Sequence, residues 1–251
     1  HTRSAHVSWL GDVYKRQNEG FARVGAEFKS VRAEIVAGGQ ATSADKVSYG
    51  DKTVQQALDD LNYKAIAINS FTNDVGTVEM GSTVTDVTLS YSFNKTAKSL
   101  TLDGTAIDVA STKQVLTGLT ITANKTYTLT ATDDRDAKAT KTTSISFLNG
   151  CYYGVGTVDV DGADKAFVAG LTKVLSGSRA RTIDVTAGEG EFIYYAIPHR
   201  LGTPSFTVGG FEGGFSLLKT FDYENPAGYT ESYDVYKSTN ANLGATKVVI
   251  A

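Results

Sequence analysis

The sequence of 251 residues contains one cysteine, Cys151, and three histidines. Intrachain disulfides are therefore impossible, although small β-rich proteins that mature outside cells often use them. A structural zinc site needs three or four clustered Cys and His ligands, which this composition does not supply, so we expect no metal. No run of about 18 apolar residues occurs, so we expect no membrane insertion. The fold must be held together by burial of its apolar side chains, either within one chain or also against partner chains, and we expect no cofactor.

Methionine and tryptophan occur once each, at Met80 and Trp9, and the chain begins with His1 rather than an initiator methionine. The stretch VSWLGDVYKRQ, residues 7–17, resembles the translation of a transposase adapter used for sequencing libraries. We therefore predict that residues 1–17 are a non-native, adapter-derived segment on a truncated metagenomic reading frame, and set them aside. The alternative is a genuine amphipathic N-terminus.

The remainder of the chain has few basic residues and a mildly acidic balance. Removing the three basic residues and one acidic residue of 1–17 leaves 21 basic and 26 acidic residues, a net charge of −5. A mildly acidic chain without basic clusters argues against nucleic acid as a partner. His199 is the one histidine left.

Residues 18–77 are predicted to form a helical stem. The first helix carries apolar side chains at alternating spacings of three and four, the pattern of a coiled-coil seam, and Gly38-Gly39 ends it. So narrow a seam does not support a short helix alone in water, so the helix packs either on its own chain or on copies of itself. Both alternatives stay open. The seam residues are Phe21, Val24, Phe28, Val31 and Ile35.

A second, shorter helix is indicated after Thr53. Thr53 as N-cap and Gln56 three positions later form a capping box. Apolar residues follow on one helix face from Val54 to Leu61. We interpret this segment as a neck rather than the core of a domain.

From about Val78 the apolar period changes from helical to two. Alternating runs such as TVTDVTLSYSF, together with Asp103-Gly104 as a hairpin tip, predict four to seven short strands. Tyr127 opens one alternating run and looks like the tyrosine corner of immunoglobulin-like modules. We predict a small immunoglobulin-like β-sandwich over residues 78–149.

Residues 150–251 are rich in glycine and aromatic residues. Six segments read as strands, and residues 164–175 read as one helix with Phe167, Leu171 and Leu175 on one stripe. We therefore predict a mainly β chain with an N-terminal helical stem, the small immunoglobulin-like β-sandwich, and a C-terminal β-sandwich-like domain.

Catalytic chemistry finds little support. A Ser-His-Asp or Cys-His arrangement needs a positioned histidine, and only His199 is available. No G-x-S-x-G motif occurs, and Cys151 has no neighbouring base in sequence. Glycoside cleavage needs two carboxylates at a set distance, for which Glu189 and Glu191 are the nearest candidates. A solvated hairpin tip explains these two equally well, so we predict no catalytic residues and no enzyme.

Two aspartate-rich turns resemble cation sites only in part. Asp159, Asp161 and Asp164 surround Gly162, but the bidentate glutamate of an EF-hand loop is missing. Asp133, Asp134 and Asp136 have Arg135 inserted between them. A turn without metal is the favoured interpretation of both, since Asp-Gly is first a turn signal.

Candidate surface-binding residues lie in the C-terminal part. Arg179 and Arg181 alternate along one predicted strand, where they either receive an anionic glycan or protect a sheet edge. Tyrosines on glycine-rich loops offer flat faces on which sugars stack, which selects Tyr223 and Tyr229. The neighbouring phenylalanines are expected in the core instead. They are Phe211, Phe215 and Phe221.

Whole phrases of the sequence resemble phage or prophage tail and baseplate structural proteins of gut-bacterial viruses. They include VEMGSTVTDVTLSYSFNKTAKSLTLDG, ANKTYTLTATDDRDAKATKTTSISFLNGCYYG and YYAIPHRLGTPSFTVGGFEGGF. The resemblance implies a virion structural protein, assembled in the bacterial cytoplasm as a homotrimer with other tail subunits, and contact with a bacterial surface glycan. It transfers no functional residue. The alternatives are a bacterial surface adhesin or carbohydrate-binding module and, third, a glycan depolymerase.

Overall fold

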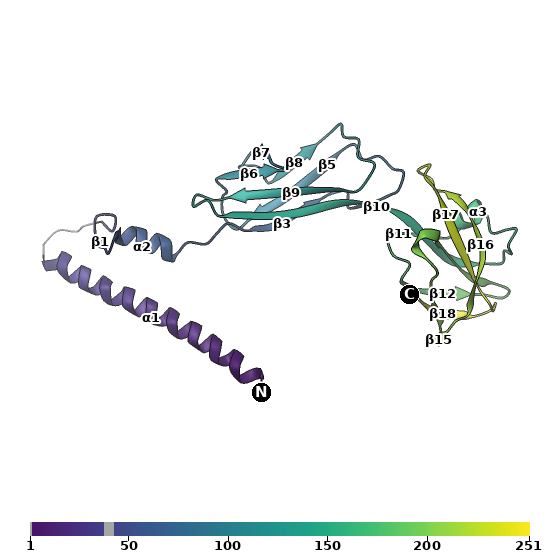
Figure 1. Cartoon of the computed structure of the whole chain (residues 1–251), viewed down its shortest axis with the longest axis horizontal. Coiled ribbons are helices and arrows are strands. Elements are labelled where there is room, and N and C mark those ends of the chain that lie inside the picture. Colours follow the sequence, from purple (N-terminus) through teal and green to yellow (C-terminus); the bar gives the residue numbers. More distant parts are fainter. Residues whose placement is uncertain (1, 38–42) are drawn as a thin grey trace. The chain divides into compact units, whose positions relative to one another are not determined.

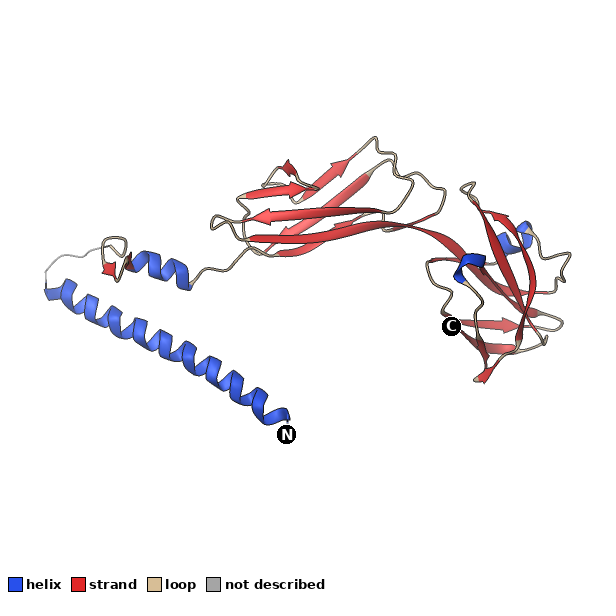
Figure 2. Ribbon diagram, in the orientation of Figure 1, coloured by secondary structure: helices blue, strands red, loops and turns tan. Residues whose placement is uncertain are grey.

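The computed structural model describes residues 2–37 and 43–251, with side chains from 14–32 and 43–251. The chain is mainly β and divides into two compact units, His1–Lys64 and Ala65–Ala251. Figure 2 shows that helices dominate the first unit, whereas the second is built mainly of strands. The predicted fold class is confirmed.

The first unit is helical, as expected of a stem. Helix α1 (Thr2–Ala37) begins inside the segment set aside as non-native. A two-residue hairpin, β1 (Ser48–Tyr49) and β2 (Lys52–Thr53), leads into α2 (Val54–Leu61). The predicted capping box is confirmed, because Thr53 Oγ1 accepts from the Gln56 N–H at 3.2 Å and Gln56 Oε1 accepts from the Thr53 N–H at 2.9 Å.

The second unit begins with a sandwich of two sheets. One sheet has the order β3-β5-β8, and the other includes β7-β6-β9-β10, with β4 parallel to β10 on the far side. Sheets of this order over one core are the immunoglobulin-like arrangement, so that prediction is confirmed. The strands are β3 (Ile68–Asn73), β4 (Thr77–Glu79), β5 (Val87–Phe93), β6 (Ser99–Leu102), β7 (Thr105–Ile107), β8 (Lys113–Leu116), β9 (Lys125–Thr132) and β10 (Lys138–Gly156).

The core of this sandwich comes from the alternating apolar positions. Leu89, Leu129 and Ile145 are completely buried. The predicted hairpin is also confirmed, since Asp103 and Gly104 join β6 to β7 with φ angles of 48° and 83°. These positive φ values are what a two-residue hairpin turn needs.

Two expectations about the sandwich are wrong. The stem was predicted to run to residue 77, but β3 pairs with β5 and buries Phe71, so the sandwich begins before 78. Tyr127 lies near the start of β9 with a buried ring, as a tyrosine corner requires. However, no bond from its hydroxyl to upstream backbone occurs among the described residues; Lys125 Nζ instead lies 5.0 Å from the ring centroid.

The C-terminal part packs two sheets and a short helix in three layers. Strands β16, β17, β13 and β10 form the central sheet, with β11 also on β10, and the order β12-β18-β14-β15 forms the second. Helix α3 covers the other face of the central sheet through the buried Val168. The elements are α3 (Lys165–Gly170), β11 (Thr172–Ser176), β12 (Arg181–Ala187), β13 (Phe192–Pro198), β14 (Phe206–Val208), β15 (Phe211–Glu212), β16 (Phe215–Glu224), β17 (Thr230–Ser238), β18 (Gly244–Ile250) and a 3-10 turn at His199–Leu201.

The helix predicted over 164–175 is too long. The observed helix ends at Gly170, and the next residues form β11 on β10, with Leu175 opposite Gly150. Pairing with a strand distant in sequence therefore overrides the helical stripe. Phe167 remains on α3 and packs edge-on against Tyr194, with ring centroids 4.7 Å apart.

Strand β10 belongs to both β modules. We call residues 65–148 the immunoglobulin-like module and 149–251 the C-terminal module. Figure 1 shows β10 leaving the first and entering the second without interruption. The predicted domain boundary at 149/150 therefore falls inside a strand rather than in a linker.

Candidate interaction surface on the stem

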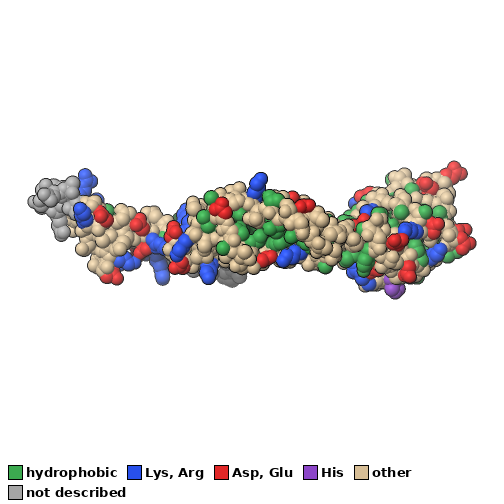
Figure 3. Space-filling model, turned by 90° about the horizontal axis from the view of Figure 1, so that it is seen from above, with side chains coloured by type: hydrophobic (Ala, Val, Ile, Leu, Met, Phe, Trp, Pro, Cys, Tyr) green, Lys and Arg blue, Asp and Glu red, His purple; other side chains and the backbone are tan. Residues whose placement is uncertain are grey.

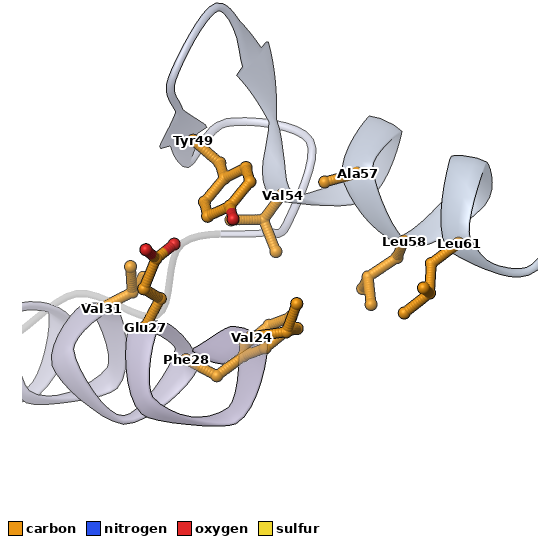
Figure 4. A pocket seen from close by; sticks show the side chains of 9 residues that line it. All are labelled: Val24, Glu27, Phe28, Val31, Tyr49, Val54, Ala57, Leu58 and Leu61. Carbon is orange, nitrogen blue, oxygen red and sulfur yellow. The ribbon is translucent and has the colours of Figure 1, made fainter. Parts of the chain in front are cut away.

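An apolar groove lies between α1 and the hairpin–α2 segment of the first unit. Figure 4 shows its side chains converging from both walls. Val54, on the wall formed by the hairpin and α2, is buried, whereas Phe28, Tyr49 and Leu61 are 39%, 38% and 50% exposed. The lining residues are Val24, Glu27, Phe28, Val31, Tyr49, Val54, Ala57, Leu58 and Leu61.

The predicted seam supplies one wall of this groove only in part. Val24, Phe28 and Val31 line it, while Phe21 is 59% exposed. The Ile35 side chain lies outside the described residues. Among the described α1 side chains, only Val24 and Val31 are even half-buried. The second wall, on α2, was predicted as an apolar face but was not assigned to the seam.

The structure places His199 beside a carboxylate and not beside a nucleophile. Its Nδ1 lies 2.9 Å from Asp234 Oδ2, and Asp234 Oδ1 also accepts from Thr220 Oγ1 at 2.6 Å. Cys151 is completely buried, and its thiol lies 3.8 Å from the Ser178 carbonyl oxygen. Burial raises the pKa of the Cys151 thiol, and the nearby Arg181 charge offsets this only in part. A protonated, enclosed thiol is a poor nucleophile.

The two glutamates considered for glycoside cleavage lie in a tight turn. Glu191 Oε2 accepts from the Gly188 N–H at 2.8 Å, and the Glu191 N–H donates to the Gly188 carbonyl. Glu189 is exposed beside Gly190, whose φ is 73°. The Glu191 carboxylate therefore closes its own turn.

The aspartates around Gly162 also serve local structure. Asp159 Oδ1 accepts from the Gly162 N–H at 3.3 Å, and Asp164 caps α3 by accepting from the Phe167 N–H at 2.9 Å. Among the described residues, no three His, Cys, Asp or Glu side chains are grouped to hold a metal ion. None of the described helices is long and apolar enough to cross a membrane.

The two candidate tyrosines have different positions. Tyr223 is 1% exposed and packs between Tyr152 and Tyr233, with ring centroids 5.4 and 5.0 Å away. Its prediction as a surface-binding residue is therefore wrong. Tyr229 is 38% exposed, but its backbone is fixed by Asn225, whose Oδ1 accepts from the Tyr229 N–H at 3.0 Å.

Arg179 and Arg181 do not share a strand face, because β12 begins only at Arg181. Arg179 donates from Nη1 to the Leu201 carbonyl at 2.9 Å and from Nε to the Ala251 carbonyl at 3.2 Å. Arg179 thus ties the chain end to a neighbouring turn. Both arginines are half-buried, and the face of the second unit seen in Figure 3 intersperses acidic and basic side chains.

One phenylalanine departs from the core prediction. Phe215 stacks on Phe206 with ring centroids 4.2 Å apart, as expected. Phe211 is 82% exposed in the two-residue edge strand β15, so its assignment to the core is wrong. Glycines at 209, 210, 213 and 214 all have positive φ. They flank β15 on both sides, and this pattern of paired glycines around one aromatic residue is the signal in the sequence that could have marked it as exposed.

No protein-family model matches the sequence, and no curated protein is similar to it. Among solved structures, the eight N-terminal immunoglobulin domains of Down syndrome cell adhesion molecule match at 12% identity and a TM-score of 0.22, over 72% of this chain and 25% of that one. An α-L-rhamnosidase from Dictyoglumus thermophilum matches at 12% identity and a TM-score of 0.24, over 75% of this chain and 25% of that one. A chitinase from Bacillus thuringiensis matches at 11% identity and a TM-score of 0.23, over 84% of this chain and 32% of that one. The chain spans less than a third of each, and likenesses this weak decide nothing about function.

Proposed function

We propose that this protein is a non-enzymatic structural subunit of a phage tail tip, baseplate or fibre. The stem joins copies of the chain, and the two β modules carry the outer surface, including contact with a bacterial surface glycan. The observation that supports this most is the apolar groove of the stem, which a single chain leaves open. Self-association covers such a surface, because exposed apolar patches are unfavourable in water.

The seam favours more than two strands. Two-stranded parallel coiled coils prefer β-branched residues at position a and leucine at d. Here Phe21, Phe28 and Ile35 occupy position a, and the β-branched Val24 and Val31 occupy position d, where no leucine occurs. This order differs from the dimer preference, and we propose a homotrimer.

Light scattering of the full chain at micromolar concentration tests the assembly. We expect the mass of a trimer, and a monomer for Val24→Asp, which places a charge in the seam. Ala26→Asp is the matched control, because Ala26 is an exposed position of the same helix and should leave the trimer intact. A monomeric parent chain would refute the stem assembly.

The phage setting is tested separately through the genes that flank the coding sequence. Tail tape-measure or holin genes support a virion protein assembled in the host cytoplasm. A sortase or secretion locus would replace it with a bacterial adhesin or carbohydrate-binding module.

A glycan depolymerase is the remaining alternative. Purified protein should bind a surface glycan without turnover. Turnover that disappears in Glu189→Gln or Glu191→Gln would make it an enzyme.

A further inference from the structure

We propose that the immunoglobulin-like and C-terminal modules form one rigid body, fixed by a continuous strand and a polar clasp beside it. Both modules lie in the single compact unit Ala65–Ala251. The proposal concerns this unit alone and does not depend on the stem or on the phage setting.

The continuous strand is β10, and each of its residues is paired. Residues 138–145 pair with β9, 146–148 with β4, 149–153 with β11 and 152–156 with β13. The ladder of one module therefore continues into that of the other without an unpaired residue. No unpaired stretch therefore lies at the module boundary to act as a flexible hinge, and the pairing with β4 and with β11 reaches the boundary from either side.

The clasp joins the end of β4 and the two residues after it, Glu79–Gly81, to the C-terminal module. Lys173 Nζ lies 2.9 Å from Glu79 Oε2, and the Glu79 carboxylate is only 13% exposed. Asn225 Nδ2 donates to the Met80 carbonyl at 2.7 Å. The Met80 N–H in turn donates to the Leu148 carbonyl at 2.9 Å, so the clasp is tied to β10 itself.

Close packing completes the clasp at Gly81. Its φ is +94°, and a Cβ on this residue would lie 2.8 Å from Tyr229 Cβ and 3.1 Å from the Ala227 carbonyl oxygen. No side chain fits there. The opposing turn is itself fixed, because Asn225 is 5% exposed and its Oδ1 accepts from the Ala227 and Tyr229 N–H groups.

A strand alone bends and twists, but a strand with a second attachment point to one side resists both motions. β10 and the Glu79–Gly81 segment supply these two attachments. The C-terminal module therefore keeps one orientation relative to the immunoglobulin-like module.

Spin-label distance measurements test this proposal. Labels at Thr105→Cys and Glu189→Cys, both exposed, report across the boundary, and Glu189→Cys with Asp222→Cys reports within the C-terminal module. The parent chain, whose lone Cys151 is buried, controls for background labelling. Mixing with an excess of unlabelled chain ensures that an oligomer contains at most one labelled copy, so that only distances within one chain are measured. We expect one cross-boundary distance, as narrow as the distance within the module. A broad or two-peaked distribution would overturn the proposal.

Gly81→Ala tests the clasp in the same measurement. We expect a wider cross-boundary distribution, with unchanged circular dichroism. Gly118→Ala is the matched control, because Gly118 has a φ of +68° but open space around a Cβ. Equal widths in the two variants would refute the role of the clasp. If Gly81→Ala does not fold, the width of the cross-boundary distance distribution in the chain with glycine at 81 still decides whether the modules are rigid.

Discussion

The Asn225 side-chain amide donates a 2.7 Å hydrogen bond to the Met80 carbonyl, 145 residues earlier in the chain. Asn225 is 5% exposed, and its side-chain oxygen organises the turn that leads to Tyr229. One buried side chain thus fixes a local turn and a contact between modules.

Asn225→Ala should lower the free energy of unfolding by about 2–3 kcal/mol, because it leaves buried backbone groups without partners. Denaturant unfolding of the full chain measures this loss. Asn240→Ala, at an exposed position, should change it by less than about 0.5 kcal/mol. An equal change in the free energy of unfolding for the two variants would show that the buried Asn225 amide does not stabilise the fold.

Asp133→Ala should destabilise the immunoglobulin-like module by about 3 kcal/mol. The Asp133 carboxylate is 1% exposed, accepts from the Ile66, Arg135 and Ala137 N–H groups, and lies 2.7 Å from Lys95 Nζ. Thermal unfolding checks this, with the exposed neighbour Asp134→Ala as control. A loss no larger than that of the control would contradict the central position assigned to Asp133.

Truncation to alanine should change the free energy of unfolding little at Phe211 and much more at Phe215. Phe211→Ala should leave stability within about 0.5 kcal/mol of the parent, as for other exposed positions. Phe215→Ala should cost about 2–3 kcal/mol, because its ring stacks on the buried Phe206. Calorimetry of both variants measures the difference, and a large loss for Phe211→Ala would place its ring in the core after all.

Stability should fall above about pH 10, the ordinary pKa of tyrosine in an unfolded chain. Burial raises the pKa of Tyr194 to about 12, and the charge of Asp159 adds to the shift. The folded state then holds the phenolic proton more tightly than the unfolded state, so stability is complete below about pH 10 and declines as the pH rises toward 12. Burial also raises the pKa values of Tyr152, Tyr195 and Tyr233.

Tyrosinate absorbance and circular dichroism, followed together from pH 8 to pH 12, measure this dependence. Ionisation of the buried phenols should accompany unfolding. Tyr194→Phe, which loses the hydroxyl bond to the Val158 carbonyl, should show a shallower decline. An unchanged slope would contradict the assignment to Tyr194.

The parts of the fold set by neighbours in sequence were predictable. Thr53 and Gln56 are three residues apart, and Asp103 and Gly104 are adjacent, so the capping box and the hairpin needed no knowledge of the rest of the chain.

The errors arose where distant segments decide. Thr172–Ser176 is a strand because β10 offers it an edge, and Tyr223 is buried because Tyr152 and Tyr233 surround it. The seam was visible as a spacing on α1, but its second wall required the position of α2 in space. Exposure of Phe211 likewise depends on how the flanking glycines turn the backbone.

Because β10 runs through both β modules, it limits where such chains can be cut and recombined. A chimaera cut at residues 149/150, where composition changes most, would graft a foreign sequence onto the middle of a shared ladder. The cut would split the residues of β10 that pair with β11, because Asn149 would come from one parent and residues 150–153 from the other. We therefore expect residues 65–251 to be exchangeable as a whole, whereas smaller pieces that are swapped singly should misfold and aggregate.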